Sequence, residues 1–355
     1  MPDPSRLISL ADLNTLHLAA FARSLVSLER SADLLAISES LGSRPRVILG
    51  GGSNLVLQSN HDQPFEEVVL HNRLRGIVRL PEKEGFVRIR CAGGESWHAF
   101  VMWTLSQGLG GLENLALIPG TVGAAPIQNI GAYGVELAER VEAVHAWDFT
   151  SRDHVVFPRE SCRFDYRHSV FKEPTMQGPW NAPRFLITAV DFCLWPSTRA
   201  PQVVNYAGLS GRLAQMGIAD RPQPLQIAHA VISLRREKLP DPEELGNVGS
   251  FFKNPLVPEG LAVALRSQYP EMPVYPHATG KKLSAGWLIE SAGLKGARRG
   301  EAGVYSRHAL VLVNHGKATG HDILGLARDI QQAVMSRFGV WLEPEPQILP
   351  PLHTA

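Results

Sequence analysis

The segment IPGTVGAAPIQNIGAYG, residues 118–134, is the most informative stretch of this 355-residue chain. It ends a longer region, 108–134, in which seven of 27 residues are glycine and only Glu113 is charged. A loop with so few charged side chains must satisfy its polar groups largely through its own main chain. Its amides could therefore hold a pyrophosphate, and the alternative is an irregular packed loop. Long glycine-rich loops inside compact domains are usually functional, which favours the binding site.

A second glycine-rich stretch, GGGSN at residues 50–54, lies between two predicted strands at 46–49 and 55–57. Three consecutive glycines let the backbone approach a ligand closely and adopt positive φ values. Their amides can also form an anion-binding concavity. The alternative interpretation is a tight β-turn with no ligand.

Other nucleotide and hydrolase motifs are missing from the chain. No G-x-G-x-x-G opens a helix after a strand, so the common dinucleotide-binding fingerprint is absent. No G-x-S-x-G elbow of a hydrolase occurs. Any nucleotide site must therefore be built from the two glycine loops in another way.

Composition excludes several classes of protein. The formal net charge is +1, which argues against a general nucleic-acid binder, because such proteins need many Lys/Arg–phosphate contacts. No run approaches the ~18 consecutive apolar residues of a spanning helix. The first residues lack the basic and apolar regions of a signal peptide. We therefore expect a cytoplasmic protein with neither a membrane nor a nucleic acid as partner.

Cysteine and histidine usage favours neither a disulfide framework nor a metal site. Cys91, Cys162 and Cys193 are far apart and form no C-x-x-C pair, so we interpret them as small buried residues. The 13 histidines show no H-E-x-x-H spacing. The sequence thus predicts no metal.

The order of the expected elements indicates an α+β fold. Roughly the first 40 residues have a helical pattern, with Gly42 as its stop. Further helices are expected at 97–105, 285–291 and 322–338, and β segments at 46–49, 55–57, 66–95, 141–195, 309–313 and 340–349. Because strands and helices mix without regular β–α–β alternation, α+β is the predicted class.

Together with further blocks, the glycine loops resemble those of the UDP-N-acetylenolpyruvoylglucosamine reductase family, bacterial flavoenzymes of peptidoglycan synthesis. The blocks follow that family's order over nearly the whole chain: 48–55, 118–134, FDYRHSVFK at 164–172, KLPDP at 238–242, GSFFKNP at 249–255, SAGWLIE at 284–290 and LEPE at 342–345. Two places depart from the family pattern. Leu16-His17 stand where Phe-Gly is usual after Asn14-Thr15, and Ala124-Ala125 stand where serines are common.

The resemblance implies a three-domain architecture. Two domains form a FAD-binding fold of the vanillyl-alcohol-oxidase (PCMH) type: residues 1–80, joined by a C-terminal strand within 340–355, and residues 81–238. The third, residues 239–339, is an α+β substrate-binding domain.

The resemblance also implies the reaction. A hydride passes from NADPH to FAD and then to the terminal carbon of an enolpyruvyl ether, so that UDP-N-acetylglucosamine enolpyruvate becomes UDP-N-acetylmuramate. We expect FAD to be bound non-covalently, because neither glycine loop contains a His or Cys that could anchor it. The expected partners are these small molecules only, and the chain is expected to act as a monomer.

Three residues are expected to be catalytic. Arg167 offers a permanently charged, bidentate donor to the substrate carboxylate. Ser250 is expected to donate the proton to the intermediate, although a serine in this position could also serve as a cap or a phosphate ligand. A protonated carboxyl beside the carboxylate would stabilise the intermediate. Residue chemistry does not separate Glu343 from Glu345; the resemblance selects Glu345.

The resemblance further implies two sets of binding residues. The expected FAD-binding residues are Gly50, Gly51, Gly52, Ser53, Asn54, Leu55, Gly120, Thr121, Gly123, Ala124, Asn129, Ile130, Gly131, Ala132, Tyr133 and Gly134. The expected substrate-binding residues are Tyr166, Tyr206, Arg235, Lys238 and Asn254. Tyr206 and Lys238 suit phosphate oxygens, and Arg235 adds charge if its segment is helical.

Two rival functions remain open at the level of sequence. One is another flavoenzyme of the same fold, such as an alcohol or hydroxyacid oxidase, which would share the glycine loops but not Ser250 with Glu345. The other is a non-catalytic protein that binds a nucleotide sugar, which would be colourless when purified.

Overall fold

The computed structural model describes residues 7–177, 182–206, 208–218 and 220–350. Two compact units are recognised in it. Unit 1 comprises residues 1–8, 22–51 and 65–237, and unit 2 comprises residues 9–21, 52–64 and 238–355. The chain therefore crosses between the units several times, once within the glycine loop 50–54.

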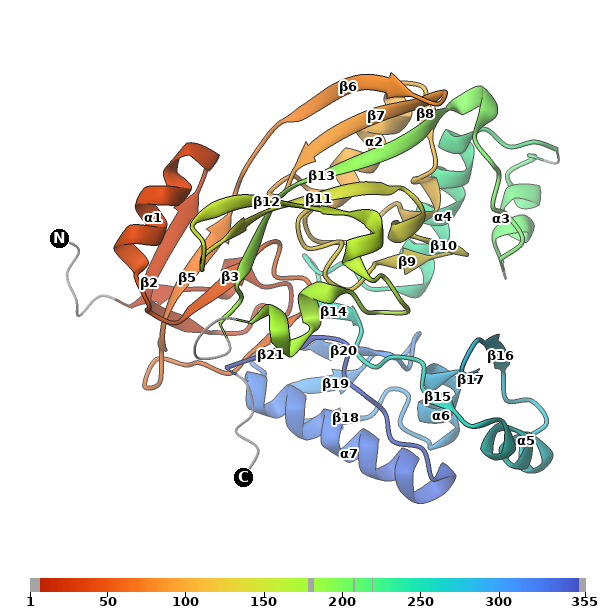
Figure 1. Ribbon diagram of the computed structural model, residues 1–355. Coiled ribbons are helices and arrows are strands. Elements are labelled where there is room, and N and C mark those ends of the chain that lie inside the picture. Colours follow the sequence, from red (N-terminus) through yellow and green to blue (C-terminus); the bar gives the residue numbers. More distant parts are fainter. Residues whose placement is uncertain (1–6, 178–181, 207, 219, 351–355) are drawn as a thin grey trace. The chain divides into compact units, whose positions relative to one another are not determined.

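Unit 1 contains a parallel sheet at its N-terminal end. The order across this sheet is β1 (Ile8–Ser9), β2 (Phe21–Leu28), β5 (Phe65–Asn72) and β3 (Arg46–Leu49). Both β2 and β3 run parallel to β5. Helix α1 (Leu34–Leu41) lies beside the sheet (Figure 1), and its Leu41 packs with Val68 and Leu70 of β5. Gly42 ends the helix at φ 55°, as the sequence predicts.

The helical pattern expected for the rest of the first 40 residues is wrong. Residues 21–28 form strand β2 instead, and Ser24 and Leu25 pair with Val68 and Val69. The reason is tertiary, because the hydrogen-bond partners of β2 lie about forty residues further along the chain and local propensity does not include them.

A larger antiparallel sheet forms the rest of unit 1. Its strands, in order, are β12 (Asp153–Pro158), β11 (Val141–Asp148), β13 (Phe185–Pro196), β7 (Phe86–Ala92) and β6 (Ile77–Lys83), with β8 (Leu109–Gly110) paired to β13. Helices α2 (Trp97–Ser106) and α4 (Pro224–Lys238) contribute to the core of this sheet, and α3 (Leu209–Gln215) is short. The rings of Trp97, Phe100 and Phe192 meet there. The helix that Ser96 caps is confirmed, and the predicted β segments are confirmed at β6, β7, β11, β12 and β13. Between β12 and β13 the chain forms short 3-10 helices and turns instead, and residues 178–181 of the predicted segment lie outside the described residues.

Unit 2 contains a second antiparallel sheet. Its order is β14 (Gly246–Ser250), β20 (Val311–Asn314), β19 (Ala302–Val304) and β18 (Arg298–Arg299). Helix α7 (Gly320–Phe338) lies along this sheet (Figure 1) and begins at a capping box formed by Thr319 and Asp322. A small sheet of β15 (Leu256–Val257), β17 (Gly280–Leu283) and β16 (Val274–His277) accompanies helices α5 (Glu259–Gln268) and α6 (Ala285–Ser291).

The C-terminal segment returns to the chain around the first glycine loop. Strand β21 (Gln347–Leu349) pairs in parallel with β4 (Leu55–Leu57). The predicted strand 340–349 is therefore right only in its last three residues. Pro344 and Pro346 lack the N–H donors that a longer strand needs, and Pro344 makes an isolated bridge to Phe252. Among the described residues, no helix has both the length and the apolar character that crossing a membrane requires.

The antiparallel sheet carries an ion cluster around the buried carboxylate of Asp191, with Arg90 partly exposed. Arg90 donates two hydrogen bonds to its carboxylate, of 2.7 and 2.8 Å, and His145 Nε2 lies 2.9 Å from Oδ2. Burial alone raises the pKa of the Asp191 carboxyl, but these partners outweigh burial and bring its pKa to about 2. The charged carboxylate is therefore stabilised by the fold.

We predict that Asp191 contributes to acid stability. A carboxyl whose folded pKa is depressed stabilises the fold above its unfolded pKa of about 3.9, and the contribution is lost as the pH falls through about 2. Asp191→Asn should lower the free energy of unfolding at neutral pH by about 2 kcal/mol and flatten its pH dependence in that window. Urea unfolding between acid and neutral pH measures both; the exposed Asp62→Asn serves as control. An unchanged acid profile would contradict the prediction.

Candidate active site

Two loops leave the sheet of unit 1 at the C-terminal ends of neighbouring parallel strands. Strands β3 and β5 are parallel neighbours with Leu49 opposite His71, so Gly50–Gly51 and Arg73–Arg75 emerge side by side. The second glycine loop meets them there. A cavity of about 240 Å³ results, and it is lined by Gly50, Gly51, His71, Asn72, Arg73, Arg75, Gly94, Ser96, Gly120 and Thr121.

The glycines of this cavity allow one main chain to lie directly on another. A Cβ atom on Gly51 would stand 2.8 Å from Gly120 Cα, and one on Gly50 would stand 2.5 Å from Thr121 Oγ1. Gly94 meets the backbone of Arg73 and Leu74 in the same way. The two glycine loops are thus in contact, and any side chain at these positions would push the cavity wall apart.

Three basic residues on the cavity were not identified from the sequence. His71, Arg73 and Arg75 lie at alternate positions at and just after the end of β5; Arg75 pairs with Glu95 at 3.0 Å and Arg73 with Glu29 at 3.5 Å. Burial lowers the pKa of His71, and Arg73 and Arg75 lower it further. The cavity therefore suits a phosphate group through side chains as well as amides. The detectable signal was HNRLR directly after a strand parallel to the one that precedes GGGSN.

The later part of the second glycine loop is organised by Asn129. This residue is fully buried at φ 45°, and its Nδ2 donates to Glu136 Oε2 at 2.8 Å and to the Asp165 carbonyl at 3.1 Å. Its Oδ1 accepts from the Ala138 amide at 2.9 Å. The Asn129 side chain therefore joins the loop to its neighbours. Ile130 belongs to the core, and the short strands β9 (Gly131–Ala132) and β10 (Val135–Glu136) follow.

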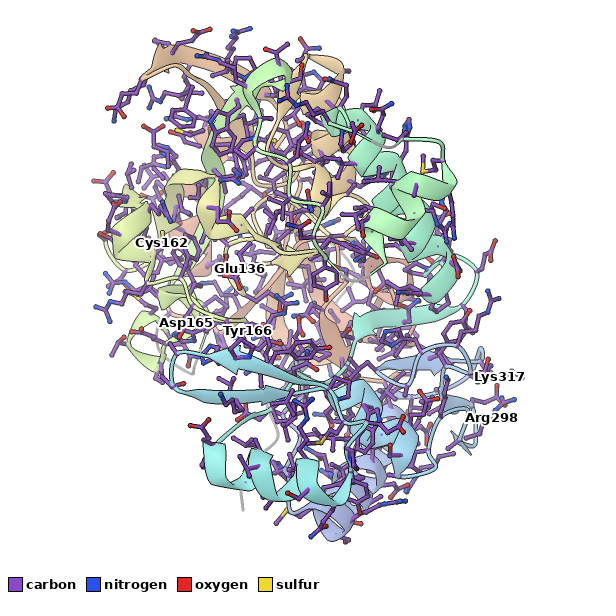
Figure 2. All side chains as sticks on the ribbon, turned by 90° about the vertical axis from the view of Figure 1, so that its right-hand side faces the viewer. Glu136, Cys162, Asp165, Tyr166, Arg298 and Lys317 are labelled. Atoms are coloured by element: carbon purple, nitrogen blue, oxygen red, sulfur yellow. The ribbon has the colours of Figure 1, made fainter. Side chains whose placement is uncertain are left out.

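The hydrogen bond from Asn129 to the Asp165 carbonyl connects the glycine loop to the tight turn that contains Arg167. Asp165 and His168 pair across this turn, and Arg167 adopts a left-handed φ of 54°. Its Nη2 donates to the Gly131 carbonyl at 3.1 Å, and its guanidinium lies 5.3 Å from the ring centre of Tyr166. Figure 2 shows Asp165, Tyr166 and Glu136 in one region of this unit.

The backbone at Arg167 is strained and held from several sides. A left-handed arginine costs about 1–3 kcal/mol relative to glycine and persists where its surroundings impose it. Lys172 Nζ donates to the Arg167 carbonyl at 3.2 Å, and buried Ser169 donates to Ile127 at 2.6 Å. Such strain concentrates at functional positions, which agrees with the role expected of Arg167.

Tyr206, Tyr133 and Arg235 lie together elsewhere in unit 1. The rings of Tyr133 and Tyr206 meet edge to face at 5.5 Å, and Tyr206 is half exposed. Burial raises the pKa of the Tyr133 phenol and lowers that of the Arg235 guanidinium, while each group counteracts the shift of the other. The stretch 224–238 is helical, so the condition attached to Arg235 is met. Gly134 lies against Tyr206 and Val203.

Ser250 stands at the end of β14 in unit 2, directly after a β-bulge. The register with β20 shifts between Asn247 and Ser250, and Gly249 takes a φ of 69°. Asn247 shapes the bulge, because its Oδ1 accepts from the Gly249 amide at 2.9 Å. Bulges often re-aim a side chain next to an active site. Among the residues that the structure describes, the Ser250 hydroxyl has no hydrogen-bond partner.

The segment of Glu345 runs beside Ser250. The Glu345 amide donates to the Phe251 carbonyl at 2.8 Å, and the Lys253 amide donates to Glu343 at 3.0 Å. The two glutamates differ in environment. Glu343 is exposed and its carboxylate pairs with Lys253 at 3.1 Å, whereas Glu345 is partly buried. The first glycine loop also reaches this segment, because Asn54 accepts from the Gln347 amide at 2.9 Å.

The remaining expected site residues have identifiable positions. Asn254 uses its Oδ1 to cap helix α6, accepting from the Ala285 amide at 3.0 Å. Lys238 is exposed at the end of α4. Ser53 is half buried in a turn, and Leu55 begins β4. Arg167 therefore belongs to unit 1, and Ser250 and Glu345 belong to unit 2.

The structure shows the surroundings of both departures from the family pattern. His17 has a left-handed φ of 53°, a conformation that favours glycine, and its Nε2 lies 2.8 Å from the Pro242 carbonyl. Ala125 is buried in the core, where a serine hydroxyl would need a partner. Thr15, which matches the family pattern, stabilises the bulge before Ser250, because its hydroxyl donates to the Asn247 carbonyl at 2.6 Å.

Comparison with protein families identifies the class of this site. A model described as FAD binding domain matches residues 24–152, which contain both glycine loops and the basic residues of the cavity. The cavity, with its glycine contacts and basic wall, fits the phosphates of such a cofactor. The chain is a flavoprotein of the PCMH type and a flavin-dependent oxidoreductase.

More specific similarities identify the family. Residues 241–349 match the C-terminal domain of UDP-N-acetylenolpyruvoylglucosamine reductase. The chain is 48% identical to that enzyme of Chromobacterium violaceum over 346 residues, 96% of this chain and 98% of the other, and 47% identical to that of Xylella fastidiosa over 345 residues, 96% and 94%. The crystal structure from Thermus caldophilus has a similar fold, with a TM-score of 0.64 at 26% identity over 97% of this chain and 98% of the other. The chain therefore belongs to the UDP-N-acetylenolpyruvoylglucosamine reductase family.

We predict that Gly51→Ala loses most of the bound FAD. The added methyl would meet the Gly120 backbone at 2.8 Å, and neither main chain can move without opening the cavity. Acid precipitation, which releases non-covalent flavin into the supernatant, measures the content; we expect a fall of about tenfold or more. Gly211→Ala in α3 meets nothing within 4 Å and should keep its flavin. Full flavin content in Gly51→Ala would refute the assignment.

Proposed function

We propose that Arg167, Ser250 and Glu345 are the catalytic residues of this enzyme. As a member of its family, the chain catalyses the reduction of UDP-N-acetylglucosamine enolpyruvate to UDP-N-acetylmuramate with NADPH, a step of peptidoglycan precursor synthesis. The observation that carries the proposal is the Ser250 hydroxyl. It follows a bulge, makes no hydrogen bond among the described residues and lies beside the Glu345 segment. A hydroxyl that no described residue binds can donate its proton to a substrate, as this role requires.

The substrate sets the demands on these residues. An isolated enol ether is electron-rich and resists hydride attack. Its attached carboxylate must be polarised so that the double bond behaves as a conjugate acceptor, and the adjacent carbon must receive a proton. Bound FAD supplies the hydride chemistry, and the protein supplies orientation and electrostatic stabilisation.

Arg167 is proposed to bind the substrate carboxylate. Its charge is independent of pH in the working range, and its planar donors suit a carboxylate. The strained turn supports this role, because Asn129, Ser169 and Lys172 hold the surrounding backbone in place before substrate arrives. Such preorganisation avoids reordering the turn when negative charge develops.

Glu345 is proposed as the acid that shares this developing charge. Of the two candidates, Glu343 is exposed to solvent, which would keep its carboxyl ionised, so it is the weaker choice for an acid. Glu345 is partly buried, and its backbone is fixed to Phe251, the residue after Ser250. Ser250 then protonates the adjacent carbon, with a positioned water as relay.

The remaining proposed residues bind the substrate or position the flavin loop. Tyr206 and Arg235 belong to one cluster of unit 1, which suits the substrate diphosphate, and exposed Lys238 adds a point charge. Tyr166 lies beside Arg167, and Asn254 retains its Nδ2 donor after capping α6. Asn129 is proposed to position the flavin loop through its side chain.

The proposed organisation comprises three domains, at 1–80 with 340–355, 81–238 and 239–339. The pairing of β21 with β4 supports the return of the C-terminal strand. We further propose a monomer that acts in the cytoplasm on soluble nucleotides. Three cysteines without disulfides agree with a reducing compartment.

We predict that Ser250→Ala spares the first half-reaction and disables the second. Reduction of the flavin by NADPH needs no proton donor at the substrate carbon. Loss of a positioned acid should slow reoxidation by substrate about 10²–10⁴-fold. Stopped-flow absorbance separates the two steps, and exposed Ser267→Ala on α5 is the control. Equal losses in both half-reactions would indicate a structural role for Ser250.

We predict that Arg167 and Glu345 act as one unit. Removal of either should cost orders of magnitude in kcat, and removal of both should cost little more than the worse single change. Arg167→Lys should rescue only in part, because an ammonium cannot make the paired planar contact. Glu345→Gln should be milder than Glu345→Ala, and Glu343→Gln nearly silent. Steady-state kinetics decide this; a larger loss in Glu343→Gln would move the acid to that residue.

A further inference from the structure

Leu117 is a left-handed residue immediately before the second glycine loop. Its φ is 58°, although a leucine gains nothing there that glycine would not provide at lower cost. Only Ile118 and Pro119 separate it from Gly120, whose backbone touches Gly51 on the cavity wall. The conformation of Leu117 therefore sets the direction in which the chain enters the cavity.

Both polar groups of the Leu117 backbone are held by side chains from two helices. Its amide donates to His98 Nδ1 of α2 at 3.0 Å, and its carbonyl accepts from Arg235 Nε of α4 at 3.2 Å. Neighbouring Trp97 adds a bond on each side, from its indole to the Leu115 carbonyl at 2.9 Å and from its amide to the Gly120 carbonyl at 3.0 Å. The strained residue is thus fixed from several directions.

The His98 bond requires an unprotonated Nδ1. Burial lowers the pKa of His98, and the positive charges of Arg236 and Arg235 on α4 lower it further. The environment therefore keeps the imidazole neutral and able to accept the Leu117 amide. Arg235 binds the Leu117 carbonyl through Nε alone, so its two terminal nitrogens are not used by this contact.

We propose that His98 and Arg235 are positioning residues that hold Leu117 left-handed and thereby present Gly120 and Thr121 to the FAD. The proposal rests on the proposed role of residues 120–134 in flavin binding. It adds that the flavin loop depends on a histidine outside that loop, and that the arginine proposed for substrate also supports the flavin side.

The test compares isosteric replacements of His98. The amide oxygen of asparagine stands close to the position of Nδ1, whereas that of glutamine stands nearer to Nε2. His98→Asn should keep FAD affinity within about threefold, and His98→Gln and His98→Ala should weaken it about tenfold. Titration of the flavin-free protein with FAD, followed by quenching of flavin fluorescence, gives the dissociation constants. Exposed His229→Ala on α4 is the control.

A second site separates positioning from packing. Leu117→Gly removes the conformational penalty, so it should restore most of the affinity in the His98→Gln background although it removes further side-chain contacts. A packing role would predict additional loss instead. Hydrogen exchange of the flavin-free protein should also show faster exchange around Leu117 in His98→Gln but not in His98→Asn.

The outcomes distinguish this proposal from the assignment of the loop. Normal FAD affinity in His98→Gln, together with loss of FAD in Gly51→Ala, would overturn the proposal and leave the loop assignment intact. Normal affinity in both variants would overturn both. Equal loss in His98→Asn and His98→Gln, without rescue by Leu117→Gly, would also overturn the proposal.

Discussion

Direct contact between two glycine backbones is the constraint on which the flavin side of this protein depends. Gly51 and Gly120 lie so close that a single methyl group would separate them. They belong to segments about seventy residues apart, and a regular element holds each of them. Gly51 follows strand β3, and the Gly120 carbonyl accepts a hydrogen bond from the amide of Trp97, the first residue of helix α2. The close approach gives the cavity a wall of main chain, and the parallel arrangement of β3 and β5 adds basic side chains to the same edge. A phosphate-bearing cofactor needs both features.

Backbone strain occurs at several positions where this chemistry is proposed. Of the nine non-glycine residues with positive φ among the described residues, four belong to the proposed site or its immediate neighbours: Leu117, Asn129, Tyr133 and Arg167. Three of them have backbone groups bound by other side chains: His98 and Arg235 bind Leu117, Asn114 binds the Tyr133 carbonyl, and Lys172 binds that of Arg167. The stability of the fold thus maintains a loop geometry that the loop sequence alone would not choose.

In unit 2 the position of the Ser250 side chain likewise depends on contacts from distant parts of the chain. Ser250 follows a β-bulge, and buried Asn247 stabilises this bulge by accepting from the Gly249 amide. The Asn247 carbonyl in turn accepts a hydrogen bond from the Thr15 hydroxyl. Hydrogen bonds therefore connect Thr15, the strand that ends at Ser250 and the segment of Glu345. This connection explains how His17 can replace glycine at a left-handed position, because its surroundings already fix the local backbone.

The amino-acid sequence was sufficient for the family, through its ordered blocks, and for the helix ends at Ser96 and Gly42; it also predicts a cofactor site at the glycine loops. Each of these features depends on residues close together in the chain, so a short stretch of sequence is enough to predict it. Tertiary structure decided the rest. Strand β2 exists because β5 pairs with it, and Arg73 and Arg75 reach the cavity because two parallel strands end together. Glu345 is more buried than Glu343, which is exposed and pairs with Lys253. Such differences arise from contacts between distant segments, which no local pattern contains.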